Sequence, residues 1–362
     1  MRKKLGGILA AALFFSGLSA SPGGAAEPVF VGTTFSHRQS GYLDMDWKQS
    51  YLEILKLNFY SIRLGAYWDE IERVEGVYDF STLDWQMAEA ARRKIPVVLT
   101  VGMKAPRWPE FFIPDWLEKK IRVRIGGDVS RDPLLRDRTL RFVEAVVKRY
   151  REKAVVRYWQ VENEALDRSG PRFWRIGADF LAEEIALVKR LDPASRPVIL
   201  TAATYPNTVL FFLARFQLGG NPIVDNLALC DILGINVYPV VGQMFWRFKI
   251  YFWSSPEERT DYFSRLMRLA RRAKKDIWIM ELQAEPWEPG LLVHKTREQP
   301  PTGLPENVRK SFEELRTIGY HAIFLWGAEY WYYRSLHHED RRWWQMVSEL
   351  VKDRIQSGRA TA

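Results

Sequence analysis

Cysteine is almost absent from this sequence: Cys230 is the only one among 362 residues. A single thiol excludes an intrachain disulfide framework and any zinc or iron-sulfur site built from several cysteines. Beyond residue 20 the sequence has no apolar run long enough for a transmembrane helix. It also has no Gly-rich phosphate loop after the first predicted strand, and no basic stripe combined with a nucleic-acid-reading motif. These absences exclude a nucleotide-dependent enzyme of the usual kind and argue against a nucleic-acid partner.

The composition is that of a folded globular protein with many aromatic residues. Hydrophobic residues make up 47% and charged residues 27%, and Gly and Pro number only 23 and 19. The chain has 15 Trp, 15 Tyr and 20 Phe, more than a core needs and suited to recognising flat apolar faces. The formal net charge of +9 is spread along the chain and allows weak attraction to anionic surfaces or acidic polysaccharides.

The N-terminus has the order of a secretory signal. Basic residues 2–4 precede an apolar run, Leu5 to Ala20, and small residues lead to Glu27. The run is shorter than the ~20 residues that span a bilayer, which favours a cleaved signal peptide, residues 1–26, over a permanent anchor. We therefore expect a secreted or periplasmic protein, with an N-terminal anchor as the alternative. Residues 27–353 are predicted to form one domain, and residues 354–362 a flexible tail.

Short β-rich segments alternate with amphipathic helical patterns along the whole domain, which predicts an α/β fold, a (β/α)8 TIM barrel. Helical patterns include 83–93, 138–151, 173–191, 256–273 and 306–318. Pro-rich segments 105–114 and 286–305 each follow a strand, and we interpret them as active-face loops. The eight predicted strands are Val29 to Phe35, Phe59 to Leu64, Pro96 to Val101, Val155 to Val161, Pro197 to Ala202, Ile232 to Val237, Ile277 to Met280 and Ala322 to Trp326.

Glutamates stand at the ends of the fourth and seventh predicted strands. The fourth leads into Glu162-Asn163-Glu164, and the seventh into Met280-Glu281. Reactive groups of such barrels lie at the C-terminal ends of the strands, and these two strands face each other across the mouth. Two carboxyls held in unequal environments can serve as a proton donor and a nucleophile. Glu164 and Glu281 are therefore the predicted catalytic pair.

The sequence around these residues resembles clan A retaining glycoside hydrolases, most closely the family 42 β-galactosidases and their cellulase-like (family 5) relatives. The resemblance implies that Glu164 is the acid/base and Glu281 the nucleophile. It also implies that Arg63 and Tyr238 hold Glu281, that Asn163 binds the sugar 2-hydroxyl, and that Trp326 forms the floor beneath the sugar. The segments that carry the resemblance are Ile62-Arg63-Leu64-Gly65 with Trp68, Glu75-Gly76-Val77-Tyr78-Asp79-Phe80, Asn163-Glu164, Gly234-Ile235-Asn236-Val237-Tyr238-Pro239, Met280-Glu281-Leu282-Gln283-Ala284-Glu285-Pro286-Trp287 and Phe324-Leu325-Trp326-Gly327.

Three further side chains are predicted to contact sugar from the loops. His37 follows the first strand and can reach a sugar hydroxyl, although a loop histidine is as often plain surface. Trp108 and Trp287 follow the third and seventh strands and are predicted stacking platforms.

Other ionisable residues are interpreted as having no role in the site. Glu162, Glu285, Glu288 and Glu329 are expected to be solvated loop residues. The run His337-His338-Glu339-Asp340 has the composition of a metal cluster, but adjacent side chains diverge, so no metal site is predicted.

Residues 244–253, Met-Phe-Trp-Arg-Phe-Lys-Ile-Tyr-Phe-Trp, form an unusual segment after the sixth strand, with six aromatic and two basic residues. Three interpretations remain open. The segment is a helix packed on the barrel, which we favour, or a wall of sugar-stacking aromatics, or an interfacial patch that contacts a membrane or lipid-linked glycan.

The sequence thus predicts an exported retaining β-glycoside hydrolase that cleaves β-linked oligo- or polysaccharides by double displacement, with no metal or organic cofactor. Two alternatives remain open: a non-catalytic carbohydrate-binding barrel at the cell envelope, and a transglycosylase, in which a sugar hydroxyl replaces water in the second step.

Overall fold

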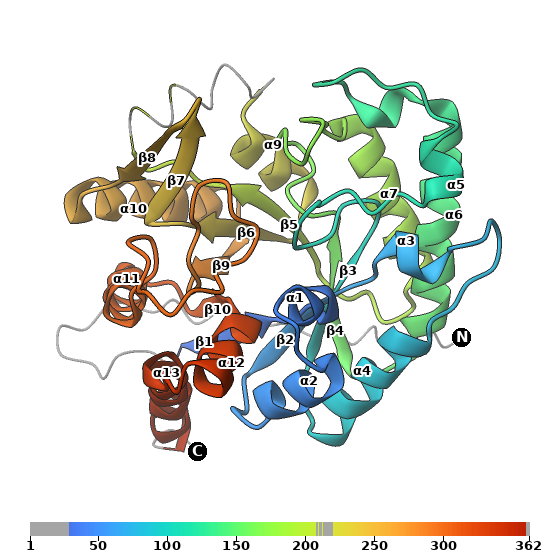
Figure 1. Cartoon of the computed structure of the whole chain (residues 1–362). Coiled ribbons are helices and arrows are strands. Elements are labelled where there is room, and N and C mark those ends of the chain that lie inside the picture. The colour runs from blue at the N-terminus through green and yellow to red at the C-terminus, as the bar shows by residue number, and fades with distance from the viewer. Residues whose placement is uncertain (1–28, 208, 210–211, 213–219, 360–362) are drawn as a thin grey trace, which may run out of the picture.

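The chain folds into a closed barrel of eight parallel strands, described by a computed structural model over residues 29–359 except 208, 210–211 and 213–219. Going round the barrel, the strand order is β1-β10-β9-β6-β5-β4-β3-β2 (Figure 1). The predicted (β/α)8 barrel is confirmed, with strand ends shifted by a few residues at most. The strands are β1 Phe30–Thr34, β2 Ser61–Gly65, β3 Val97–Val101, β4 Val156–Val161, β5 Val198–Ala203, β6 Ile232–Val237, β9 Asp276–Gln283 and β10 Ala322–Trp326.

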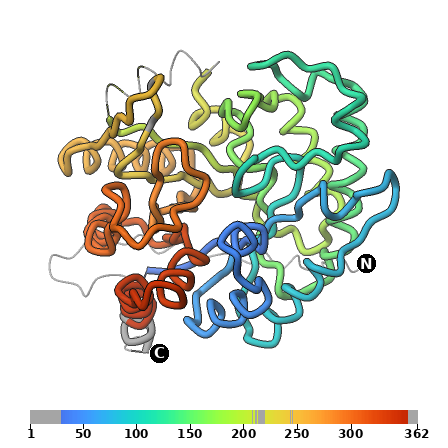
Figure 2. Tube along the Cα trace, viewed as in Figure 1, coloured from blue at the N-terminus to red at the C-terminus, as the bar shows by residue number. Residues whose placement is uncertain are grey.

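Helices surround the barrel, and the C-terminal elements return to the N-terminal ones, because β10 pairs with β1 (Figure 2). None of the described helices is both long and apolar enough to cross a membrane. The described helices are α1 His37–Tyr42, α2 Trp47–Leu55, α3 Trp68–Ile71, α4 Ser81–Arg92, α5 Asp115–Glu118, α6 Pro133–Tyr150, α7 Ala178–Leu191, α9 Pro222–Leu229, α10 Pro256–Arg272, α11 Pro305–Ile318, α12 Ala328–His337 and α13 Arg342–Arg359, with a 3-10 turn at Val129–Arg131.

Local sequence chemistry explains where two helices begin. α6 starts five residues before the predicted Arg138, because the Asp132 side chain accepts from the Leu134 and Leu135 N–H groups and Pro133 occupies the first turn, where proline is tolerated. α7 starts at Ala178 and not at Phe173, since Trp174 and Arg175 form isolated bridges with Ser169 and Asp128.

The barrel interior is apolar at one end and polar at the other. A buried cluster formed by β3, β5, β6, β9 and β10 closes the lower part. Glycine is needed there: a Cβ at Gly32 would lie 2.6 Å from Phe324, and one at Gly234 2.6 Å from Met280. Nearer the C-terminal ends of the strands the interior side chains become polar, with Arg63, Gln160 and Thr201 all buried. The fold therefore leaves chemistry to the C-terminal face.

Residues 244–253 belong to an antiparallel hairpin, β7 Val240–Phe245 and β8 Phe248–Trp253, so the favoured prediction of a helix is wrong. The segment is rich in aromatic and branched residues, which suit a pleated strand more than a helix. The chain reverses at Trp246, where φ is +62°.

The predicted signal peptide, residues 1–26, lies outside the described residues. Of the predicted tail, residues up to Arg359 continue α13 and residues 360–362 lie outside the described part.

Candidate active site

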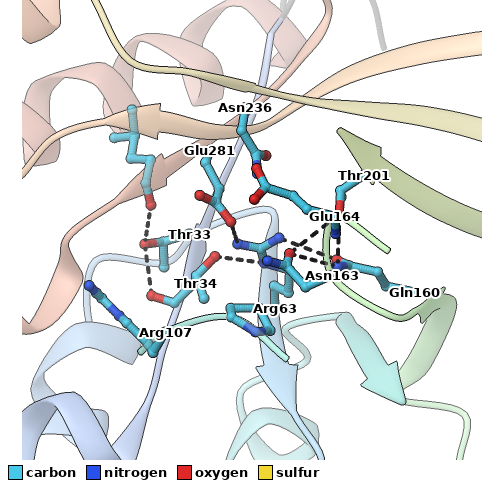
Figure 3. A network of polar contacts seen from close by, with 12 residues as sticks. Thr33, Thr34, Arg63, Arg107, Gln160, Asn163, Glu164, Thr201, Asn236 and Glu281 are labelled. Carbon is cyan, nitrogen blue, oxygen red and sulfur yellow. Dashed lines mark hydrogen bonds and ion pairs between the residues drawn. The ribbon is translucent and has the colours of Figure 1, made fainter. Parts of the chain in front are cut away.

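Glu281 lies near the C-terminal end of β9, and each of its carboxylate oxygens accepts a hydrogen bond. The Nη2 of Arg63 donates to its Oε1 at 2.6 Å, and the Tyr238 hydroxyl donates to its Oε2 at 2.7 Å. Arg63 is fully buried, and its other nitrogens donate to Thr34 and Gln160. A buried guanidinium with a fixed position stabilises the ionised carboxylate (Figure 3).

Glu164 lies three residues beyond the end of β4 in the left-handed region, with φ of +47°. Its N–H donates to Thr201 Oγ1 at 2.8 Å, and its carbonyl accepts from Lys104 Nζ at 2.7 Å, so its backbone is held on both sides. Burial raises the pKa of the Glu164 carboxyl well above its usual range. The carboxylates of Asp167, Glu110 and Glu281 add to this rise, and Lys104 opposes it. Glu164 therefore keeps its proton under conditions in which an exposed glutamate is ionised.

Asn236 on β6 connects the two glutamates. It is the register partner of Glu281 on the neighbouring strand, and its Nδ2 donates to Glu164 Oε1 at 2.7 Å. Figure 3 shows the Glu164 and Glu281 side chains converging beside Arg63 and Asn236. One carboxyl of the pair thus accepts from an arginine and a tyrosine, and burial raises the pKa of the other.

Asn163 is held by the same polar network. Its Oδ1 accepts from Gln160 Nε2 at 3.1 Å and from the Thr201 hydroxyl at 3.3 Å. Its backbone N–H donates to the Lys104 carbonyl. Because the amide oxygen is engaged, the amide nitrogen is the group of Asn163 that is suited to donate to a substrate hydroxyl.

Trp326 ends β10 and is buried with a cation on its ring. The Arg107 guanidinium lies 4.0 Å from the ring centroid. Arg107 in turn pairs with Glu285 and with Glu329, whose Oε2 lies 2.5 Å from Nη2. The Arg107 guanidinium, itself fixed by two buried ion pairs, therefore packs on the Trp326 indole and orients it at the barrel mouth.

The interpretation of four glutamates as solvated loop residues is wrong, because Glu162, Glu285, Glu288 and Glu329 are all buried. Glu162 accepts from the Met103 and Lys104 N–H groups, and Glu288 accepts from Tyr251 and Thr302. Groups distant in the sequence enclose these carboxylates, as Arg107 does for Glu285 and Glu329. Each then needs a donor, since an unpaired buried charge is costly.

Trp287, Trp108 and His37 are the remaining predicted residues. Trp287 is half exposed, and its ring meets that of Tyr238 edge to face at 5.4 Å, which places it beside the site. Trp108 is half exposed in the loop after β3. His37 is engaged by Glu70, with 2.5 Å between Nε2 and Oε2, and its ring meets Tyr67 edge to face.

Sequence reasoning missed Asn236, Arg107, Lys104 and Thr201. Asn236 was detectable from the sequence. It lies two residues before Tyr238, so both side chains are expected on the same face at the end of the predicted strand. Lys104 and Arg107 follow β3 in a Pro-rich loop without any periodic pattern, so nothing local indicated their burial. Within the described ranges no group of three or more His, Cys, Asp or Glu side chains is arranged to hold a metal ion.

Residues 42–175 match the profile of glycoside hydrolase family 42, described as beta-galactosidase. The matched region contains Arg63, Asn163 and Glu164, and it ends before Glu281. The resemblance to clan A glycoside hydrolases that the strand ends indicated is thereby confirmed, and glycoside hydrolase is also the enzyme class of the matched family. The comparison with curated proteins found no match to this sequence.

Solved structures of glycosidases share the fold. A β-galactosidase from the Antarctic haloarchaeon Halorubrum lacusprofundi is 16% identical with a TM-score of 0.59, and the match covers 90% of this chain and 58% of that one. An exo-β-1,4-mannosidase from an Opitutaceae bacterium is 14% identical with a TM-score of 0.59, covering 92% and 61%. A GH5_18 protein from Streptomyces cattleya in complex with GlcNAc is 12% identical with a TM-score of 0.61, covering 91% and 81%.

The chain spans less than two thirds of the length of the β-galactosidases that it matches. At these identities the likeness establishes the barrel fold alone.

Proposed function

We propose that this protein is a retaining β-glycoside hydrolase that cleaves β-linked oligo- or polysaccharides. The observation that carries the proposal is the contrast between two converging carboxyls. Glu281 is held by a buried arginine and a tyrosine, whereas burial and neighbouring carboxylates raise the pKa of Glu164. A nucleophile that stays ionised and an acid that stays protonated are what double displacement requires.

In the first step Glu281 attacks the anomeric carbon, and the bond from that carbon to the leaving oxygen breaks. Glu164 transfers its proton to that oxygen, so the first product leaves as an alcohol. In the second step Glu164, now ionised, takes a proton from water, and the water oxygen attacks the anomeric carbon and releases Glu281. Asn163 donates to the 2-hydroxyl, and Trp326 stacks beneath the ring of the reacting sugar.

The named relatives guide the choice of first substrates. They include β-galactosidases and an exo-β-1,4-mannosidase. Aryl β-galactosides and β-mannosides, together with gluco and xylo analogues and a panel of β-linked polysaccharides, are therefore the appropriate first screen.

The test is loss and chemical rescue on an activated aryl β-glycoside. Glu281→Gln should abolish turnover. Glu164→Ala should slow it by about 10²–10⁴-fold, and azide should restore turnover with a β-glycosyl azide as product. Glu152→Gln, which changes an exposed carboxylate before β4, is the control and should retain full activity. Full activity of either active-site variant would refute the assignment.

The same preparation separates the two alternatives. Binding of a glycan by calorimetry without any product by chromatography would favour a carbohydrate-binding barrel. Products in which an added sugar acceptor replaces water would favour transglycosylation. Hydrolysis products that carry the β-configuration when first formed support the proposal.

We further propose that the protein is exported to the periplasm or the medium. The support is the order of basic, apolar and small residues in 1–26. N-terminal sequencing of the protein recovered outside the cytoplasm should begin at Glu27, and an uncleaved cytoplasmic chain would contradict export.

A further inference from the structure

The β7–β8 hairpin carries an exposed apolar tip flanked by cations, which the proposed hydrolysis does not use. Trp246 at the turn is 92% exposed, Trp253 67% and Phe248 58%. Arg247 and Lys249 beside them are exposed as well, and residues 240–253 contain no Asp or Glu. We call Trp246, Arg247, Phe248, Lys249 and Ile250 the basic aromatic tip.

One face of the hairpin is anchored to the barrel. Gly242, Met244 and their partners Tyr251 and Lys249 share this face, because cross-strand partners point the same way. Lys249, next to the turn, is nevertheless exposed and stays accessible from outside. A Cβ at Gly242 would lie 2.5 Å from Pro289, so the hairpin packs closely on the loop after β9. The Tyr251 hydroxyl donates to Glu288 Oε2 at 2.8 Å, and this hydrogen bond joins β8 to the loop after β9.

The turn and two side chains on the opposite face are exposed. Phe248 and Ile250 point to that face, since they alternate with Lys249 along β8, and both are exposed. Exposed apolar side chains gathered on a projecting hairpin mark an interaction site more often than a chance surface. Figure 1 shows β7 and β8 projecting at the periphery of the barrel.

We infer that the basic aromatic tip docks on a membrane surface rich in anionic phospholipid headgroups. Trp and Phe insert at the boundary between headgroups and acyl chains, while Arg and Lys attract the anionic headgroups. The tip combines these two features, and no carboxylate interrupts it.

Other occupants fit the tip less well. Sugar-binding sites combine aromatic platforms with carboxylates that accept from sugar hydroxyls, and residues 240–253 contain no carboxylate. Two copies meeting through this tip would bring four cations together in a chain whose net charge is already +9. An anionic bilayer is complementary to both the charge and the apolar side chains.

Docking at this place orients the barrel mouth. The hairpin begins two residues after Tyr238, and the Val240 N–H lies 3.3 Å from Gln283 Oε1 at the end of β9. The base of the hairpin therefore lies at the same end of the barrel as Glu281. The docking inference does not depend on the proposed hydrolysis, because it rests on other residues and is measured without substrate.

The test places a polarity-sensitive probe on the tip of the full chain. Cys230 is buried, so a single new cysteine, Phe248→Cys, carries the nitrobenzoxadiazole label. On vesicles of phosphatidylglycerol its emission should shift to the blue and rise at least twofold. Vesicles of phosphatidylcholine should give little change. The same label at Ile125→Cys, a 74% exposed residue on another loop, is the control and should not respond.

Charge reversal then tests the cations. Arg247→Glu with Lys249→Glu in the labelled chain should weaken the response to anionic vesicles at least tenfold, because each basic residue contributes about fivefold. The control pair is Lys94→Glu with Lys153→Glu, which removes equal charge from the opposite end of the barrel, before β3 and β4. This pair should leave the response of the probe to anionic vesicles unchanged. Equal weakening by both pairs, or an unresponsive probe at Phe248→Cys, would overturn the inference.

Two further outcomes would also overturn it. A shift of the probe on insoluble glycan but not on vesicles would assign the tip to sugar. A concentration-dependent dimer by light scattering, abolished by Trp246→Ser without vesicles present, would assign it to a second copy of the chain.

Discussion

Asn236 donates from Nδ2 to Oε1 of Glu164 at 2.7 Å, while its own Cα is in register with that of Glu281. One amide on the strand between β5 and β9 thereby sets the position of the proton donor relative to the nucleophile. Sequence analysis assigned a role to Tyr238, two residues later on the same face, and left Asn236 without one.

We expect Asn236→Ala to lower kcat/KM by about 10–100-fold on substrates with poor leaving groups, since those depend most on a positioned acid. The donor stabilises the ionised form of Glu164, so removing it raises the pKa of this carboxyl and moves the alkaline limb of the pH profile of kcat/KM to higher pH. A pH–rate series on wild type and variant measures both effects. A loss that is equal for good and poor leaving groups, with an unmoved limb, would contradict the positioning role.

Arg107 is predicted to be a major contributor to stability, because it neutralises Glu285 and Glu329 inside the protein. Arg107→Met leaves two buried carboxyls without their partner and should cost about 3–5 kcal/mol in the free energy of unfolding. Urea denaturation measures this. The triple variant with Glu285→Gln and Glu329→Gln should recover part of the loss, and failure to recover any would mean that packing on Trp326 dominates.

The buried pair Glu162 and Glu184 should make stability fall as pH rises. Burial raises the pKa of Glu162 to about 7 and that of Glu184 well above its usual range, where the neighbouring Glu162 carboxylate adds to the rise. The folded state therefore binds more protons than the unfolded state, whose glutamates titrate near pH 4.3. The contribution is fully present below that pH and is lost as pH rises through about 7.

Unfolding free energies of wild type measured between about pH 4 and 8 should decline by roughly 3 kcal/mol from this source. Glu184→Gln, whose amide can donate to Glu162, should flatten the decline. An unchanged slope in this variant would mean that other groups set the pH dependence.

Gly102 should not tolerate a side chain. Its φ is +121°, and a Cβ would lie 2.2 Å from the Glu162 carboxyl carbon. Gly102→Ala should therefore lower stability by about 3 kcal/mol or more, through backbone strain and displacement of Glu162. Gly76→Ala is the matched control, with φ of +77° and no atom within 4 Å. It should cost only the backbone part, about 1 kcal/mol. Thermal melts of both variants test the difference, and equal losses would show that the contact is unimportant.

The sequence alone determined the barrel and the two glutamates at its strand ends, because these depend on local regularities. Alternating β-rich and helical patterns repeat eight times, and they predict strand positions to within a few residues of the structure. The end of a strand is also a local property. Glu164 and Glu281 could therefore be proposed as a pair before any distance was known, and Arg63 and Tyr238 as partners of Glu281 from the resemblance.

Only the tertiary structure decided which ionisable groups are buried and what they contact. Glu162, Glu285, Glu288 and Glu329 were predicted to be solvated, and all four are buried against other parts of the fold. Arg107 meets Glu285 and Glu329 across separations of 178 and 222 residues, which no periodic pattern encodes. For residues 244–253 the favoured prediction was a helix, and they lie in a hairpin, since aromatic residues fit either element until cross-strand pairing selects one. Short-range periodicity specifies elements, whereas desolvation and charge pairing depend on which elements meet.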